Sequence, residues 1–211
     1  MVRIAPEGYP FIGVFAALTL LAFIALGPLV AAAPLALGLF MVYFFRDPER
    51  RLPAAEGYVS PADGRVVSIA PQYERQYLKR NTMRISIFMS PLNVHVNRSP
   101  CDGEVMSVRH TPGSLKAAYK ESASLKNENT AMILREKDGE VLVRQVAGFL
   151  ARRVVCRVGP GDRLKRGQRF GIIKLSSRLD VYLPLEVDIV VKPSETVRAG
   201  ETLLASPKER K

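Results

Sequence analysis

One stretch of the sequence, residues 11–45, contains no charged side chain. A helix that crosses a bilayer needs roughly 20 mostly apolar residues, so this stretch is too long for one span and marginal for two. Gly27, Pro28 and Pro34 lie near its middle, where proline disfavours a continuous helix. The stretch therefore predicts a hydrophobic helical hairpin, which forms a membrane-anchoring domain at residues 1–50.

Basic residues flank this hairpin on both sides. Arg3 precedes it, and Arg46, Arg50 and Arg51 follow it. The positive-inside rule then places both ends in the cytoplasm, with the following domain on the cytoplasmic face of the cell membrane. Two alternatives stay open. One is a cleaved signal peptide, which the length of the apolar stretch disfavours, and the other is a buried hairpin inside a soluble protein.

The overall charge points to the kind of partner. Lys and Arg number 31 against 20 Asp and Glu, which gives a net charge of +11 and implies an anionic partner. The apolar hairpin favours an anionic phospholipid and its membrane over nucleic acid.

The two cysteines, Cys101 and Cys156, lack the CxxC or Cys/His neighbours of a zinc or redox site. We therefore expect a lipid-facing protein in a reducing environment, with no metal and no nucleic acid.

Residues 51–211 are long enough for one globular domain, and their pattern is that of a mostly β protein. Short runs rich in Val and Ile are separated by Gly, Pro and Asp. One short helix is expected at residues 115–122. We expect strands at residues 65–69, 83–88, 103–110, 131–135, 141–146, 153–158, 171–175 and 185–191.

Two segments of this domain resemble each other. Residues 158–167 and 191–200 share the pattern Val-x-Pro-x-acid-x-apolar-basic-x-Gly. The repeat predicts two similar hairpins packed with pseudo-symmetry, as in the barrel-sandwich domains that carry lipoyl or biotinyl groups. Chance similarity is the alternative, and neither repeat presents a convincing modifiable lysine at a hairpin tip.

Three segments carry candidate catalytic side chains. Asp63 lies in a Ser-Pro-Ala-Asp-Gly turn, His95 in a polar run, and Ser177 in a loop after an apolar strand. Each has an ordinary interpretation, since Asp-Gly is most often a plain turn, a lone histidine is usually structural, and adjacent serines carry little information. Together they supply a nucleophile, its base and an orienting carboxylate. His110 is the other histidine in the chain, in a less polar setting.

Several motifs together resemble one family, the short phosphatidylserine decarboxylases. The matches are collinear from about residue 40 to residue 185. The motifs are Phe-Phe-Arg-Asp-Pro-Glu-Arg at 44–50, Ser-Pro-Ala-Asp-Gly at 60–64, Asn-Val-His-Val-Asn-Arg at 93–98, Gln-Val-Ala-Gly at 145–148, Ala-Arg-Arg at 151–153 and Ser-Arg-Leu-Asp-Val-Tyr-Leu-Pro at 177–184.

The resemblance implies a self-processing proenzyme. Ser177, activated by His95 with Asp63 behind it, attacks the carbonyl of Ser176, and the chain is cleaved between 176 and 177 into a large β chain and a small α chain. Ser177 becomes a covalent pyruvoyl group, so no external cofactor is needed. Its ketone forms a Schiff base with the amine of phosphatidylserine and accepts electrons as carbon dioxide leaves, which yields phosphatidylethanolamine.

Arg98 and Asn97 are the candidate substrate-binding residues under this resemblance, because a guanidinium pairs well with a lipid phosphate. The sequence leaves open whether the lipid is diacyl or the ether-linked archaetidylserine, and it leaves open a homo-oligomer.

The chain departs from the family pattern at three places. Ser176 stands where members usually have glycine, which alone reaches some backbone conformations, and the sequence therefore predicts an uncleaved or slowly cleaved form. Arg98 stands where longer members carry a second histidine, and residues 127–129 differ slightly from the usual run. A cleavage-defective lipid-binding relative and a lipoyl-like barrel-sandwich adaptor are the alternative functions.

Overall fold

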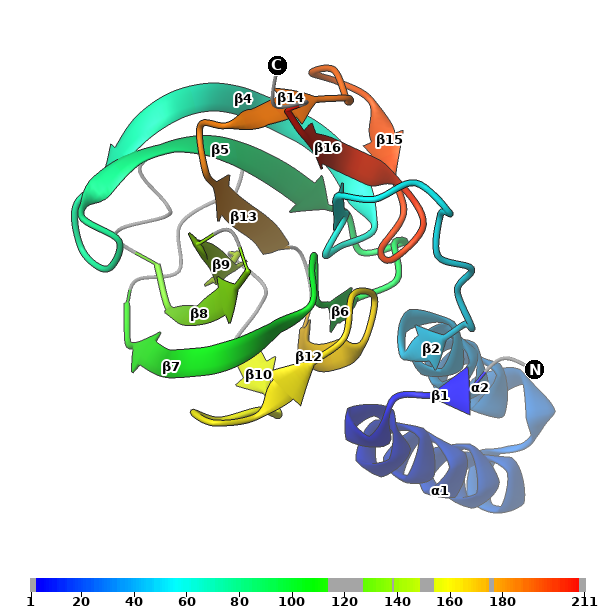
Figure 1. The fold of residues 1–211 in the computed structure, drawn as a ribbon. Coiled ribbons are helices and arrows are strands. Elements are labelled where there is room, and N and C mark those ends of the chain that lie inside the picture. Colours follow the sequence, from blue (N-terminus) through cyan, green and yellow to red (C-terminus); the bar gives the residue numbers. More distant parts are fainter. Residues whose placement is uncertain (1–2, 114–126, 138, 149–153, 175–176, 209–211) are drawn as a thin grey trace. The chain divides into compact units, whose positions relative to one another are not determined.

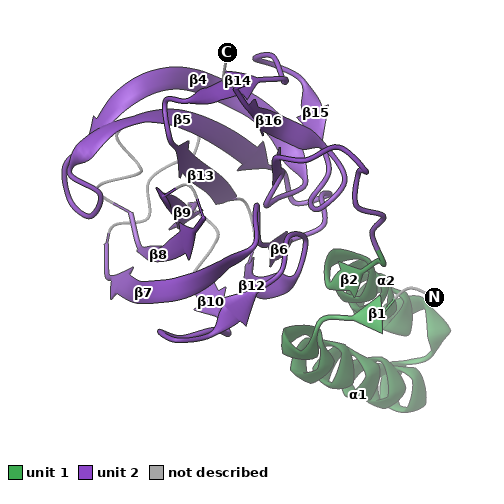
Figure 2. Ribbon diagram, in the orientation of Figure 1, with its two compact units in different colours: residues 1–49 green, residues 50–211 purple. Residues whose placement is uncertain are grey.

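The computed structural model describes residues 3–113, 127–137, 139–148, 154–174 and 177–208. The chain divides into two compact units, residues 1–49 and 50–211 (Figure 2). The helix expected at residues 115–122 lies outside the described residues, as does Ser176.

The first unit is a helical hairpin. It consists of β1 (Arg3–Ile4), the 3-10 helix η1 (Pro6–Gly8), α1 (Tyr9–Leu26), α2 (Pro28–Phe44) and β2 (Arg46–Asp47). The turn falls at Gly27, whose φ of 85° suits glycine, and Pro28 begins α2, where its missing N–H costs no hydrogen bond. Pro34 lies inside α2 and not at the turn. Antiparallel pairing of β1 with β2 closes the open end of the hairpin (Figure 1).

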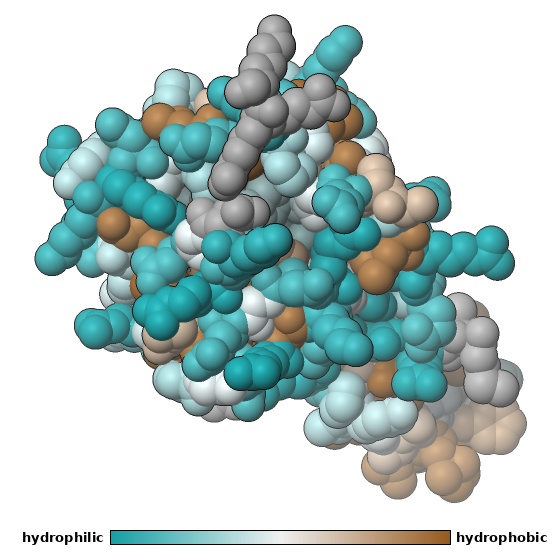
Figure 3. All heavy atoms as spheres, viewed as in Figure 1, coloured by the Kyte–Doolittle hydropathy of each residue, from teal (hydrophilic) through white to brown (hydrophobic). Residues whose placement is uncertain are grey.

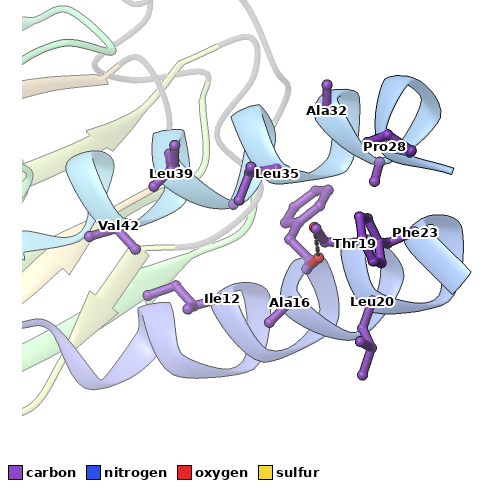
Figure 4. Close-up of a pocket in the computed structure, with 13 residues that line it drawn as sticks. Ile12, Ala16, Thr19, Leu20, Phe23, Pro28, Ala32, Leu35, Leu39 and Val42 are labelled. Atoms are coloured by element: carbon purple, nitrogen blue, oxygen red, sulfur yellow. Dashed lines mark hydrogen bonds between the residues drawn. The ribbon is translucent and has the colours of Figure 1, made fainter.

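Both helices are apolar on all sides. No residue of α1 is buried, and the helical segment Pro6–Leu26 is long and apolar enough to cross a membrane. Hydrophobic residues gather on this hairpin in the space-filling view (Figure 3). A cavity of about 600 Å³ lies between the helices, lined by side chains such as Leu20, Phe23 and Leu35 (Figure 4). The Thr19 hydroxyl in this lining donates to the Phe15 carbonyl oxygen at 2.7 Å. This polar group therefore has its hydrogen bond within α1.

The second unit is built of β-strands, which confirms the mostly β fold. In the described residues the largest sheet has the order β11-β7-β8-β9-β13-β5-β4-β15 with antiparallel neighbours, and it curls into a half-barrel (Figure 1). Two smaller sheets have the orders β10-β12-β6 and β14-β16-β3. The strands are β3 (Tyr58–Val59), β4 (Gly64–Glu74), β5 (Arg80–Met89), β6 (Val96–Arg98), β7 (Gly103–Thr111), β8 (Asn129–Glu136), β9 (Gly139–Ala147), β10 (Val154–Cys156), β11 (Arg163–Leu164), β12 (Arg169–Ile173), β13 (Ser177–Leu183), β14 (Val187–Ile189), β15 (Thr196–Val197) and β16 (Leu203–Pro207).

The repeat expected from the sequence is confirmed. Strands β10 and β12 form one antiparallel hairpin, and β14 and β16 form the other. The matching tip glycines, Gly167 and Gly200, have φ of 76° and 75°. A Cβ added to Gly200 would lie 3.7 Å from the Cα of Gly167, so the two tips pack against each other.

A second repeat follows the same pseudo-symmetry. Ser-Pro-Ala-Asp-Gly at residues 60–64 has a counterpart, Ser-Pro-Cys-Asp-Gly, at residues 99–103. In both, the serine Oγ donates to the carbonyl oxygen two residues later at 2.7 Å. In both, the aspartate Oδ1 accepts a backbone N–H from a hairpin tip, at 2.8 Å for Asp63 and 2.6 Å for Asp102. The unit is therefore made of two related halves. One contains the turn at residues 60–64 and the hairpin β14–β16, and the other contains the turn at residues 99–103 and the hairpin β10–β12.

Candidate active site

Ser177 is the first residue of β13, a central strand of the large sheet. Its cross-strand neighbours are Met89 on β5 and Ala147 on β9. The side chain is fully buried, and its Oγ donates to the Met89 Sδ at 3.5 Å. The expectation that Ser177 lies in a loop is wrong, because β5 and β9 pair with it on both sides.

Asn97 lies beside the same methionine. Its Nδ2 is 3.9 Å from the Met89 Sδ, and its Oδ1 accepts a hydrogen bond from the Gln145 Nε2 at 2.8 Å. All of these side chains are buried. A Cβ at Gly171 would come within 3.1 Å of the Gln145 Nε2 and 2.3 Å of the Val155 carbonyl oxygen, so glycine is needed there. These contacts join β6 of a small sheet to β9 and β5, the two strands that pair with β13.

His95 is fully buried just before β6. Its Nδ1 lies 2.9 Å from the Asn93 carbonyl oxygen. Because a carbonyl only accepts hydrogen bonds, a neutral His95 carries its proton on Nδ1 and its lone pair on Nε2, the atom that can act as a base. The Ile173 N–H donates to the backbone oxygen of His95 at 3.3 Å, four residues before Ser177.

A turn links His95 to the same end of the sheet. The Asn93 Oδ1 accepts from the Ser90 backbone N–H at 2.8 Å, and Ser90 directly follows Met89. Asn97 and Ser177 thus both contact Met89, and His95 is bonded to Asn93, the residue that binds the amide following Met89. The Ser177 hydroxyl is bonded to the sulfur and not to His95.

The carboxylate of Asp63 has two partners, and neither is His95. Its Oδ2 accepts from the Arg50 Nη2 at 2.7 Å and its Oδ1 from the Ala199 backbone N–H at 2.8 Å. The contact between Asp63 and His95 that we expected is therefore absent from the described part of the chain. The physical reason is that the Oδ1 bond belongs to the repeated turn and Oδ2 is neutralised by an arginine.

Arg98 is also buried and hydrogen-bonded within the protein. It is 6% exposed, and its Nη1 donates to the Gly167 carbonyl oxygen at 3.0 Å. Its backbone N–H donates to the Pro61 carbonyl oxygen at 3.0 Å. A lipid phosphate at Arg98 would have to share the guanidinium with Gly167.

The segment at residues 127–129 has a structural role that the sequence did not reveal. The Asn127 Nδ2 donates to the Ala147 carbonyl oxygen at 2.8 Å, and the Asn129 Nδ2 donates to the Asn127 carbonyl oxygen at 2.9 Å. The Ala147 N–H in turn donates to the Glu128 carbonyl oxygen. Since Ala147 pairs with Ser177, this segment holds the strand end beside the serine.

Buried charges of β13, β9 and β4 lie on the opposite face of the sheet. Arg178 and Asp180 form a two-point ion pair at 2.9 and 3.2 Å, and Arg144 pairs with Glu74 at 3.0 Å. Burial, with a smaller contribution from Asp180, raises the pKa of Tyr182 to about 12. These groups lie on the face of the sheet away from Ser177, because side chains alternate along a strand.

No group of three or more His, Cys, Asp or Glu residues suited to a metal occurs among the residues that the structure describes. The fold and site together define a β protein of two related halves, in which a buried serine at the start of a central strand contacts the same methionine as a buried asparagine, and a buried histidine directly precedes β6. An apolar hairpin precedes this protein core.

Comparison with known proteins agrees with this description. The sequence profile of phosphatidylserine decarboxylase matches residues 37–205. The phosphatidylserine decarboxylase proenzyme of Syntrophus aciditrophicus is 44% identical over 206 residues, covering 96% of this chain and 97% of that protein. The proenzyme of Nitrosomonas europaea is 46% identical over 205 residues, with 96% and 94% covered. This chain belongs to the phosphatidylserine decarboxylase family, as its motifs indicated.

Proposed function

We propose that this protein is a self-processing decarboxylase that makes a pyruvoyl group from Ser177 and converts phosphatidylserine to phosphatidylethanolamine and carbon dioxide. The observation that carries the proposal is the position of Ser177. It is a fully buried serine at the start of a central strand, and its hydroxyl contacts a thioether. The relatives are named proenzymes, which supports a cleavage step.

The proposed cleavage begins with the Ser177 hydroxyl. A thioether sulfur is a weak acceptor, so the hydroxyl can leave Met89 and give its proton to the Nε2 of His95. The Ser177 Oγ then bonds to the carbonyl carbon of Ser176, and the peptide C–N bond breaks as its nitrogen takes up the proton. Elimination from the resulting ester releases the large chain as a carboxylate. Water uptake and ammonia loss then leave the pyruvoyl group on residue 177.

Asn97 is suited to stabilise negative charge in this step. Its Oδ1 is occupied by Gln145, which fixes the amide so that Nδ2 lies on the side of Met89 and Ser177. A preorganised donor in a water-excluded site stabilises a developing oxyanion strongly. We assign Asn97 this role during cleavage and assign it a contact with the substrate afterwards. Arg98 is the proposed partner of the headgroup phosphate, shared with Gly167.

The pyruvoyl group fits the site because residue 177 is enclosed and shares the contact to Met89 with Asn97. When present, it supplies a ketone that accepts electrons as carbon dioxide leaves. In the same step His95 holds the proton that replaces the lost carboxylate, and burial of the site keeps water away from it.

The membrane is the proposed location of the reaction. The apolar helix α1 meets the length and composition of a membrane span, and the arginines that flank the hairpin favour both ends on the cytoplasmic face. The net charge of +11 draws the protein to anionic lipid. After cleavage the large β chain and the small α chain stay together, because β13 pairs with β5 and β9.

An assay on lipid vesicles tests this function. Full-length Ser176→Gly protein is mixed with phosphatidylserine vesicles, and the release of carbon dioxide and phosphatidylethanolamine is followed. We expect activity that is abolished by adding Ser177→Ala. Equal activity with and without Ser177 would contradict the proposal.

A further inference from the structure

The segment at residues 50–57, here called the linker, follows the hairpin unit in the sequence and is bound by the tips of both repeat hairpins. At one tip, the Arg166 guanidinium donates to the carbonyl oxygens of Pro53, Ala55 and Gly57 at 2.9, 2.8 and 3.1 Å. At the other tip, the Glu201 carboxylate accepts from the Arg50 Nη1 at 3.3 Å and from the Arg51 backbone N–H at 3.5 Å.

Arg50 also pairs with Asp63, one of the residues that the sequence predicted to be catalytic. Its Nη2 lies 2.7 Å from the Asp63 Oδ2, and the two side chains are only 9% and 12% exposed. The guanidinium therefore bridges Asp63 and Glu201 in a mostly buried position. Such a pair depends on both partners, because removal of one leaves an uncompensated charge.

The pseudo-symmetric half of the unit provides an internal comparison. Asp102 occupies the position of Asp63 in the other Ser-Pro-x-Asp-Gly turn and makes the same contact to a hairpin tip. Within the described residues Asp102 forms no ion pair, whereas Asp63 pairs with the linker arginine. The arginine contact is thus an addition found only in the half whose turn binds β6.

The turn that Arg50 holds is hydrogen-bonded to β6. The Pro61 carbonyl oxygen, two residues before Asp63, accepts the backbone N–H of Arg98. Arg98 ends β6, which carries Asn97 and follows His95. A chain of direct contacts therefore runs from Arg50 through Asp63 and the turn to the residues around Ser177.

We propose that Arg50 is a positioning residue for self-cleavage: by holding Asp63, the linker fixes the turn that sets the position of β6. This inference rests on the proposed function, because its main readout is cleavage at Ser177. It makes Asp63 a mediator between the linker and the site.

The test uses the full-length chain with Ser176→Gly and measures the cleavage rate by intact mass. We expect Arg50→Gln to slow cleavage about tenfold or more, because it leaves Asp63 as an unpaired buried charge. Arg50→Lys restores part of the rate. If Arg50 acts through Asp63, the double variant Arg50→Gln with Asp63→Asn is no slower than the slower single variant, since coupled sites are not additive.

Two control variants separate this role from general docking of the linker. Arg166→Gln removes the contacts to the three linker carbonyls but keeps the ion pair, and Asp102→Asn alters the symmetry-related turn. Both should cleave within about twofold of the parent, as residues outside a coupled network do. Unchanged cleavage in Arg50→Gln, or equal slowing in Arg166→Gln, would overturn the inference.

A second measurement does not depend on cleavage. In the uncleaved Ser177→Ala protein, amide hydrogen exchange is compared with and without Arg50→Gln. We expect faster exchange at the Ala199 and Arg98 amides and no change at the Arg166 amide. Unchanged exchange at Ala199 and Arg98 would overturn the inference. Absence of cleavage in the Ser176→Gly parent would instead contradict the proposed function, and the exchange result would still decide the role of Arg50.

Discussion

The Ser177 hydroxyl donates its hydrogen bond to the sulfur of Met89, its cross-strand neighbour, at 3.5 Å. Because the thioether is a weak acceptor, the serine is held in place without being tightly bound. We therefore expect Met89→Leu, which roughly conserves volume, to keep cleavage within a few-fold and to cost less than about 1.5 kcal/mol of stability.

Met89→Gln provides the contrasting variant. Its amide oxygen is a strong acceptor that would hold the Ser177 hydroxyl, so cleavage should slow markedly. The rates are measured by intact mass in the Ser176→Gly background. Equal rates for the leucine and glutamine variants would show that the acceptor strength at residue 89 does not matter.

The two histidines should differ sharply. His95→Gln should slow cleavage by about 10²–10⁴-fold, the contribution of a general base. His110→Gln should have little effect, because His110 lies on β7 with about half its side chain exposed and contacts Thr130 and Glu128. A time course of cleavage for both variants tests this assignment, which fails if His110→Gln is the slower of the two.

The buried charges behind β13 should be important for stability. Asp180→Asn should lower the free energy of unfolding by about 3–5 kcal/mol, because Arg178 then keeps its charge in a buried position. The matched control is Glu140→Gln, which breaks the exposed pair with Arg135 and should cost about 0–1 kcal/mol. Urea unfolding of the two variants measures the difference, and similar losses would contradict the account.

The cysteines should resist alkylation. Burial raises the pKa of Cys101 well above its ordinary value, with further contributions from Glu136 and Asp102, and burial also raises the pKa of Cys156. Since the thiolate is the reactive form, both should react slowly with iodoacetamide at pH 8 until urea unfolds the protein. The same shifts predict that stability falls as the pH rises above about 8.5, because only the unfolded thiols then ionise. Rapid labelling of Cys101 in the folded protein would contradict its burial.

The hairpin should behave as an integral anchor. A protein held only by its basic charge leaves the membrane at high salt, whereas an apolar hairpin leaves only with detergent. We expect the full-length protein to stay in the membrane fraction after a wash at 1 M salt, which reduces the screening length to about 3 Å. Release by salt alone would contradict the anchor.

The sequence predicted β4, β5, β7, β8, β9, β10, β12 and β14 and the hairpin repeat, because these depend on local patterns of apolar residues, glycine and proline. It missed the short strands β3, β6, β11, β15 and β16. Strand β13 was missed although Leu179, Val181 and Leu183 alternate with polar residues. The polar positions of this strand are buried too, where Arg178 and Asp180 form an ion pair.

The catalytic roles assigned from the motifs stay predictions. Of the residues named from the motifs, Ser177 and Asn97 both lie against Met89 in the structure. The partner of Asp63 could not be predicted, because its pairing with Arg50 depends on how the linker docks. The Ser-Pro-x-Asp-Gly repeat is visible in the sequence and would have suggested a structural role for Asp63. The contribution of Ser176 stays a prediction, since that residue lies outside the described structure.

The most direct test of the central claim is the intact mass of three full-length proteins: the natural chain, Ser176→Gly, and Ser176→Gly with Ser177→Ala. Under the proposed function, a serine at residue 176 allows fewer backbone angles beside the cleaved bond than glycine would, and a hindrance of about 3 kcal/mol would slow cleavage more than about a hundredfold. We predict that the natural chain is largely whole. Ser176→Gly should split into a large chain and a small chain of residues 177–211 with a pyruvoyl group at its first residue, and the double variant should stay whole. A Ser176→Gly protein that stays whole, or a double variant that still splits at this bond, would contradict the claim that Ser177 is the source of a pyruvoyl group.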